Sequence, residues 1–162
     1  SEESGNMVLV QALTASYVKI EFPYLNNLME LGNFGAILDA TLKICPVRGS
    51  YSVSMPPPAE LSLYVSDENN VSLSAITTYS GEELQNGNLV IDNLFNRDTY
   101  YSYDVTSFLK EQQGLFGVNR RSLQLIVPAD DLASSLNTLV AGDGNNSENT
   151  TKLIINYLIY NE

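Results

Sequence analysis

The chain of 162 residues contains no histidine, no tryptophan and only one cysteine. Without histidine it cannot form a Ser-His-Asp triad, a Cys–His pair or a histidine-ligated metal site. Cys45 cannot form an internal disulfide, and no histidine can activate its thiol, so we predict a structural role for it. These absences favour a protein that is not an enzyme.

Basic residues are also scarce, with 8 Lys and Arg against 19 Asp and Glu, for a formal net charge of -11. Such a surface repels phosphate backbones and anionic lipid, so we expect no nucleic-acid partner. No apolar run approaches the roughly 18 residues that a transmembrane helix needs. The chain begins at Ser1 and carries no basic-then-apolar signal segment, so we expect a mature form or a fragment of a larger protein.

What the chain has in abundance is a two-residue alternation of apolar and polar side chains, which is typical of β-strands. Hydrophobic residues make up 44% of the sequence, enough for one core, so we predict a single domain over residues 1–162. The pattern predicts an all-β fold, an antiparallel two-sheet sandwich or jelly roll. The alternating runs start near Val8, Val18, Leu38, Leu61, Val71, Tyr101, Leu123 and Thr138, with a weaker run at Leu89 and Ile91.

The last run, KLIINYLIY from Lys152 to Tyr160, is apolar on both faces. Leu153, Ile155 and Tyr157 occupy one face of the predicted strand, and Ile154 and Leu158 occupy the other. Such a strand either lies at the centre of a sheet or forms an edge that something outside this chain covers. The sequence leaves both alternatives open.

One or two short helices interrupt the strand pattern. After Tyr103, Asp104 stands at the N-cap position, where its carboxylate can accept hydrogen bonds from the first helical N–H groups. Val105, Phe108 and Leu109 form one apolar face, and Gly114 is a C-terminal stop signal. Further short helices are predicted near residues 26–31 and 130–136.

Tyrosine is the candidate ligand-binding residue type, since an aromatic ring offers a sugar a large apolar face at low entropic cost. Among the 10 tyrosines, Tyr64, Tyr100 and Tyr101 are the candidates for a glycan platform. The alternative is packing within the sheets, because tyrosine is also a favoured strand residue.

A weak calcium signal lies in the loop GDGNNSENT, where Asp143, Asn145 and Ser147 alternate as the oxygen ligands of a calcium loop do. The late bidentate glutamate of an EF-hand is missing, because position 154 is Ile154. The alternative is an exposed loop without an ion, so Ca²⁺ is the one cofactor that the sequence suggests.

Several segments together resemble a domain-of-unknown-function family of Bacteroidetes surface lipoproteins. The resemblance is carried by YVKIEFPYLNNL at Tyr17, ILDATLKICPV at Ile37, PPPAELSLYVSDENN at Pro56, YYSYDVTSFLKEQQ at Tyr100, LQLIVP at Leu123 and KLIINYLIY at Lys152. It implies an extracytoplasmic protein at the outer membrane or cell surface, with a lipid-bearing cysteine upstream. The layout is also similar to that of secreted jelly-roll modules, some of which bind carbohydrate.

The sequence thus leaves three functional hypotheses. The first is a non-enzymatic surface module that binds a polysaccharide or a partner protein. The second is a structural or assembly domain of a larger envelope protein. The third is a carboxylate-dependent glycoside hydrolase, which would need two acidic side chains at a set separation across one cleft.

Overall fold

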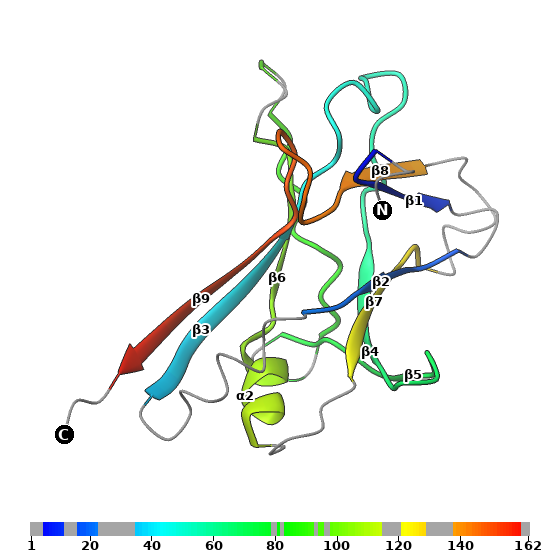
Figure 1. The fold of residues 1–162 in the computed structure, drawn as a ribbon. Helices are drawn as coiled ribbons and strands as arrows, with labels where there is room; N and C mark the ends of the chain where they lie inside the picture. Colours follow the sequence, from blue (N-terminus) through cyan, green and yellow to red (C-terminus); the bar gives the residue numbers. More distant parts are fainter. Residues whose placement is uncertain are drawn as a thin grey trace.

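The computed structural model describes residues 5–11, 16–22, 35–78, 81, 83–92, 94–95, 98–114, 121–128 and 138–159. Within these ranges the chain forms nine strands and one helix (Figure 1). Every pairing between these strands is antiparallel. The prediction of an all-β antiparallel sandwich with a short helix is therefore confirmed.

The described strands are joined by hydrogen bonds into three sheets. The small sheet pairs β1 (Met7–Gln11) with β8 (Thr138–Gly142). The four-stranded sheet has the order β2 (Val18–Ile20), β7 (Ser122–Ile126), β4 (Ser62–Ser66) and β5 (Ser72–Ala75). The three-stranded sheet has the order β6 (Tyr101–Asp104), β3 (Gly35–Ile44) and β9 (Lys152–Ile159).

The core lies between the four-stranded and three-stranded sheets. Because side chains alternate along a strand, every second residue of β3, β4 and β7 points inward. These inward residues are almost completely buried and include Leu42, Ile44, Leu63, Leu123 and Leu125. Figure 1 shows α2 at one end of this arrangement and the small sheet towards the other.

The small sheet is attached to the chain that leaves β3. Pro46 forms an isolated bridge with Ala141 of β8. Next to it, the Val47 N–H donates to the Val140 carbonyl at 2.7 Å, and the Gly142 N–H donates to the Cys45 carbonyl at 3.1 Å. The segment after β3 therefore turns a corner and continues by pairing with β8.

The helix α2 spans Thr106–Gly114. The Asp104 carboxylate accepts a hydrogen bond from the Thr106 N–H at 2.9 Å, which confirms its predicted capping role. The Val105 N–H donates to the Ala40 carbonyl at 2.9 Å, so the helix begins directly against β3. The buried face consists of Val105, Phe108, Leu109 and Gln112. The helices predicted near residues 26–31 and 130–136 lie outside the described residues.

The weak run at Leu89 and Ile91 does not form a strand. Val90 makes a single isolated bridge with Tyr100 instead. The run is short because turns limit it on both sides: Gly87 has a positive φ of 70°, and the Asp92 carboxylate accepts hydrogen bonds from the two N–H groups that follow at Leu94 and Phe95.

Two tyrosines of β6 connect the core to the loop before β4. The Tyr101 hydroxyl donates to the Pro58 carbonyl at 2.5 Å, and the Tyr103 hydroxyl donates to the Leu61 carbonyl at 2.8 Å. Both rings are buried, and this burial raises the pKa of each phenol because it disfavours the phenolate. Repulsion between the two phenolates would raise the pKa of Tyr103 further.

These raised pKa values predict an alkaline limit to stability. Above the unfolded phenol pKa of about 10, the unfolded chain releases protons that the folded chain keeps, so stability falls as pH rises, by roughly 1.4 kcal/mol per pH unit for each phenol. Denaturant titrations between neutral and alkaline pH measure this slope, and Tyr101→Phe should lower it by the share of one phenol. Ionisation of all 10 tyrosines with circular dichroism unchanged would contradict the expectation.

Candidate functional site

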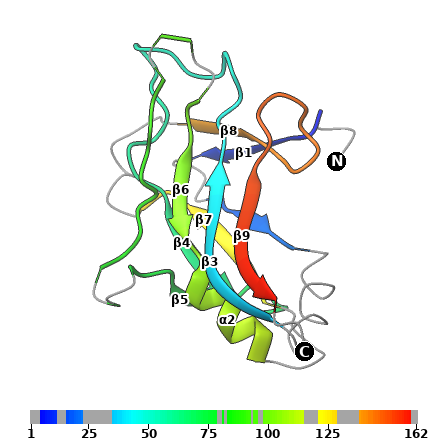
Figure 2. The ribbon, with the colours of Figure 1, turned by 90° about the vertical axis from the view of Figure 1, so that its left-hand side faces the viewer.

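The strand β9 forms one edge of the three-stranded sheet among the described strands. Figure 2 shows it on the outer side of β3, with β6 on the other side. Its pairing with β3 runs from Lys43 opposite Lys152 to Gly35 opposite Ile159. Of the two alternatives that the sequence left open for this strand, the edge is therefore the one observed.

A β-bulge in β3 shapes this edge. The register shifts between Ile37 and Asp39, which pair with Tyr157 and Asn156, so Leu38 is the extra residue. The Leu38 side chain is 56% exposed, beside the apolar side chains of β9. Because the bulge is in β3, the pairing edge of β9 itself remains continuous.

Both faces of β9 carry apolar side chains that reach solvent. On the inner face, Leu153 and Ile155 pack against the core, and the face becomes more exposed towards Ile159. On the outer face, Ile154 is 43% exposed and Leu158 is 45% exposed. Among the described strands, none pairs with the far backbone edge of β9, and this edge lies between two partly exposed apolar rows.

The devices that usually protect a sheet edge are nearly absent from β9. Such devices are proline, charged side chains, strand bulges and very short strands. Over eight residues, β9 has one charged side chain, Lys152 at its start, and no proline. A long, apolar and exposed edge of this kind is a template for pairing with another strand.

One polar contact lies at the middle of the strand. The Asn156 side-chain amide donates to both carboxylate oxygens of Asp39, at 2.9 and 3.1 Å. This contact satisfies the Asp39 charge on the outer face of the sheet, and it fixes the orientation of the only uncharged polar side chain in β9.

The start of β9 lies near Cys45. Burial raises the pKa of the Cys45 thiol, while the positive charges of Lys152 and Lys43 lower it by less. A raised thiol pKa leaves little thiolate at neutral pH. This agrees with the structural role predicted for the residue.

The three tyrosines predicted as a glycan platform are not brought together. Tyr101 is 0% exposed, so its ring face is inside the core. Tyr64 is partly exposed on the outer face of the four-stranded sheet, and Tyr100 lies on the three-stranded sheet, with the Lys43 ammonium 4.2 Å from its ring centroid. Because the outer faces of two stacked sheets point in opposite directions, Tyr64 and Tyr100 cannot contact one ligand together.

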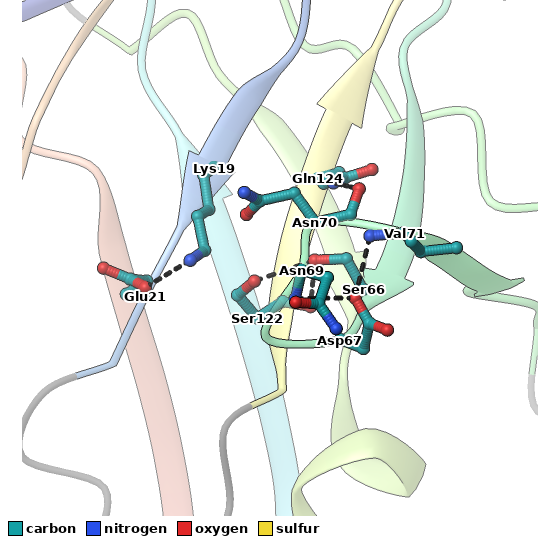
Figure 3. A network of polar contacts seen from close by, with 9 residues as sticks. All are labelled: Lys19, Glu21, Ser66, Asp67, Asn69, Asn70, Val71, Ser122 and Gln124. Atoms are coloured by element: carbon teal, nitrogen blue, oxygen red, sulfur yellow. Dashed lines mark hydrogen bonds and ion pairs between the residues drawn. The ribbon is translucent and has the colours of Figure 1, made fainter.

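The outer face of the four-stranded sheet is polar, but polar groups such as Ser66, Ser122 and Gln124 bind one another or nearby backbone (Figure 3). Gln124 is 2% exposed; its amide donates to the Asn70 carbonyl at 2.8 Å and accepts from the Ser72 hydroxyl at 2.7 Å. The hydroxyls of Ser66 and Ser122 lie 2.8 Å apart. These contacts hold the β4–β5 turn against β7, which is a structural role.

The turn between β4 and β5 is closed by Asp67. Its carboxylate accepts hydrogen bonds from the Asn69 N–H at 2.9 Å and from the Val71 N–H at 2.8 Å (Figure 3). Asn70 has a positive φ of 62°, which asparagine tolerates better than most residues. Glycan binding by this protein stays a prediction.

In the predicted calcium loop, the side chain of Asn146 orders the backbone through hydrogen bonds. The predicted ligands were Asp143, Asn145 and Ser147. The Asn146 side-chain oxygen accepts hydrogen bonds from the Glu148 and Asn149 N–H groups, at 3.1 and 2.8 Å. The Asp143 carboxylate accepts from the Asn145 N–H at 2.8 Å, while Asn145 and Ser147 are exposed. Within the described ranges, no three acidic or cysteine side chains gather as a metal site would require. Calcium binding stays a prediction.

A groove of about 160 Å³ lies beside the small sheet. Its lining is mainly apolar, with Lys19 and Glu21 among the polar residues, and the Lys19 ammonium pairs with the Glu21 carboxylate at 2.7 Å. Cavities of this size hold one small apolar molecule. The apolar lining comes from Val8, Val18, Ile20, Ile44, Leu125 and Ala141.

Comparison with protein-family models, with curated proteins and with solved structures finds no match to this chain. The resemblance to surface lipoproteins therefore stays a prediction. Over the described part of the chain, no helix is long and apolar enough to cross a membrane.

Proposed function

We propose that this chain is a non-enzymatic assembly module that pairs its β9 edge with an extended strand of a protein partner. The observation that carries the proposal is the eight-residue edge of β9, apolar on both faces and continuous in its backbone. Pairing along such an edge gives affinity through main-chain hydrogen bonds, and the exposed side chains beside it give specificity. The resemblance to surface lipoproteins adds the expectation that this assembly takes place in the cell envelope, outside the cytoplasm.

The proposal is tested on the protein in the cells that make it. Ile154→Glu places a charge on the outer face of β9, which is how natural edge strands prevent pairing. We expect the wild-type protein to migrate in native gel electrophoresis within an assembly larger than one chain, and the variant to lose that assembly. The fold should tolerate the change, because Ile154 is 43% exposed.

The matched control is Leu73→Glu. Leu73 belongs to β5, the edge strand of the other main sheet, and is 54% exposed. It adds the same charge to a comparable apolar edge position, so it should leave the assembly intact. If Ile154→Glu leaves the assembly unchanged, or if both variants dissolve it, the β9 edge is not the docking site.

A further inference from the structure

We propose that the strand that covers β9 is the β9 of a second copy of this chain, paired antiparallel and centred on Asn156. This inference rests on the proposed function and names the partner. The two three-stranded sheets would join edge to edge into one continuous sheet, and the same surface would be used on both copies, as in most two-fold dimers.

The apolar pattern of β9 is symmetric about Asn156. Three apolar residues, Leu153, Ile154 and Ile155, precede it, and three more, Tyr157, Leu158 and Ile159, follow it. Centred on Asn156, the antiparallel pairing sets Ile155 opposite Tyr157, Ile154 opposite Leu158 and Leu153 opposite Ile159 of the second copy. Every apolar side chain then meets an apolar side chain, and Asn156 meets Asn156. A strand from an unrelated protein would not require this mirrored pattern.

This register also keeps each side chain opposite a side chain on the same face of the sheet. Residues directly opposite each other in an antiparallel pair point to the same face. Ile154 and Leu158 are both on the outer face, and Ile155 and Tyr157 are both on the inner face. A shift of the pairing to a centre at Ile155 also keeps opposite residues on the same face. It would instead set Ile154 opposite Asn156 and Lys152 opposite Leu158. The register centred on Asn156 is therefore the better matched of the two.

The distribution of charge along β9 favours antiparallel over parallel pairing. Lys152 is the only charged residue of β9, and an antiparallel pair places the two copies of Lys152 at opposite ends. Those ends lie roughly 27 Å apart at the rise of a strand, beyond the Debye length of about 10 Å at 0.1 M salt. Parallel pairing would set one Lys152 directly against the other. The strand is free of acidic residues, although each chain carries a net charge of -11.

The expected dimer is weak and salt-sensitive. A single strand pairing is at the small end of protein interfaces, so we expect reversible association in the micromolar range, about 1–100 µM. Two chains with a net charge of -11 repel each other at long range. Added salt should therefore tighten the dimer, in contrast to an interface held by ion pairs.

The test is sedimentation velocity on the purified chain, with two variants on the outer face of β9. Ile154→Glu and Leu158→Lys should each weaken self-association by at least about tenfold, because each buries a charge against an apolar partner. An equal mixture of the two variants should associate again. In the register centred on Asn156, the introduced glutamate of one copy lies opposite the introduced lysine of the other. The remaining Leu158 and Ile154 still face each other as in the wild type.

The outcomes separate this inference from the proposed function. A wild-type chain that stays monomeric up to about 500 µM would overturn self-pairing, since that is far above the range expected for even a small interface. Variants that weaken association but fail to rescue each other would overturn the register. If the purified chain is monomeric while Ile154→Glu still dissolves the native assembly in cells, then the edge docks a different protein. Unchanged unfolding midpoints for both variants confirm that their folds are intact.

Discussion

Gly87→Ala is expected to destabilise the fold by roughly 3–5 kcal/mol, the sum of a backbone cost and a steric cost. Gly87 has a φ of +70°, where a residue with a side chain is strained. A Cβ atom there would also overlap the Tyr103 hydroxyl, and would lie 2.7 Å from Tyr103 Cζ and 3.2 Å from Tyr101 Cδ1.

The tyrosine rings cannot move aside to admit this methyl group. Each ring is enclosed by the core, and its hydroxyl donates to a backbone carbonyl, at Pro58 for Tyr101 and at Leu61 for Tyr103. The Leu61 N–H in turn donates to the Asn86 carbonyl at 3.0 Å, so the Gly87 turn is joined to the same backbone. A shift of either ring would break a buried hydrogen bond.

The control for this prediction is Gly81→Ala. Gly81 has a similar φ of +76°, but a Cβ atom there meets no atom of the described residues within 4 Å. The control therefore isolates the backbone cost, expected at about 1–2 kcal/mol. Chemical denaturation of both variants gives the difference. Equal losses of stability in the two variants would mean that the tyrosine rings move aside for the new methyl group. The steric cost at Gly87 would then be negligible.

Gly142→Ala is the second large expected effect, a loss of about 2–3 kcal/mol. Here the backbone has no positive φ, so the cost is steric alone. A Cβ atom would overlap the Asn149 carbonyl oxygen and lie 2.9 Å from Asn146 Cβ and Cγ. Overlap with backbone is costly because no rotamer change relieves it.

The surroundings of Gly142 are fixed from several sides. Its N–H donates to the Cys45 carbonyl, and its carbonyl accepts from the Thr151 hydroxyl at 2.6 Å. Asn146, which the methyl group would meet, orders the loop through the Glu148 and Asn149 N–H groups. The substitution should therefore loosen both the loop and the pairing of β8 with the chain after β3.

Gly144→Ala is the matched control, two residues away in the same loop. A Cβ atom there meets nothing within 4 Å, and its backbone has no positive φ. Its stability should remain within about 0.5 kcal/mol of the wild type. Thermal unfolding of both variants tests the contrast. A similar loss of stability in Gly142→Ala and Gly144→Ala would contradict the prediction. It would show that any substitution in this loop is destabilising, with or without a contact to Asn149.

Local features of this fold were predictable from the sequence because they depend on neighbouring residues. The alternation of apolar side chains correctly predicted the positions and the buried faces of most strands, as at Leu61, Leu63 and Val65 of the β4 region. The capping role of Asp104 was predictable because the cap and its N–H partner are two residues apart.

Features that depend on distant residues were not predictable in the same way. A strand that is apolar on both faces has the same sequence pattern at the centre of a sheet and at an edge. The pattern of β9 therefore does not predict which of the two positions it occupies. The separation of Tyr64 from Tyr100 follows from the assignment of their strands to different sheets. Alternation alone does not set that assignment.

Two organising amides give no signal in the sequence, Gln85 because its partners are distant and Asn146 because a neighbouring asparagine could serve equally. The Gln85 side chain donates to the Thr77 and Asp104 carbonyls, at 2.7 and 2.8 Å, and accepts from the Asp104 N–H at 2.7 Å. It thus joins the end of β6 to a distant turn. Asn146 orders its own loop, and an asparagine-rich stretch such as Asn145-Asn146 gives no signal for which of the two does so.

The pairing of β3 with β9 also affects the order in which the chain can fold. Gly35 pairs with Ile159, so this contact closes a loop of more than 100 residues, and contacts of such sequence separation form slowly. A chain made from its N-terminus exposes β3 long before β9 exists. Throughout that interval, the apolar side chains of β3 are covered only by the parts of the core already made, or by a chaperone that binds extended apolar segments.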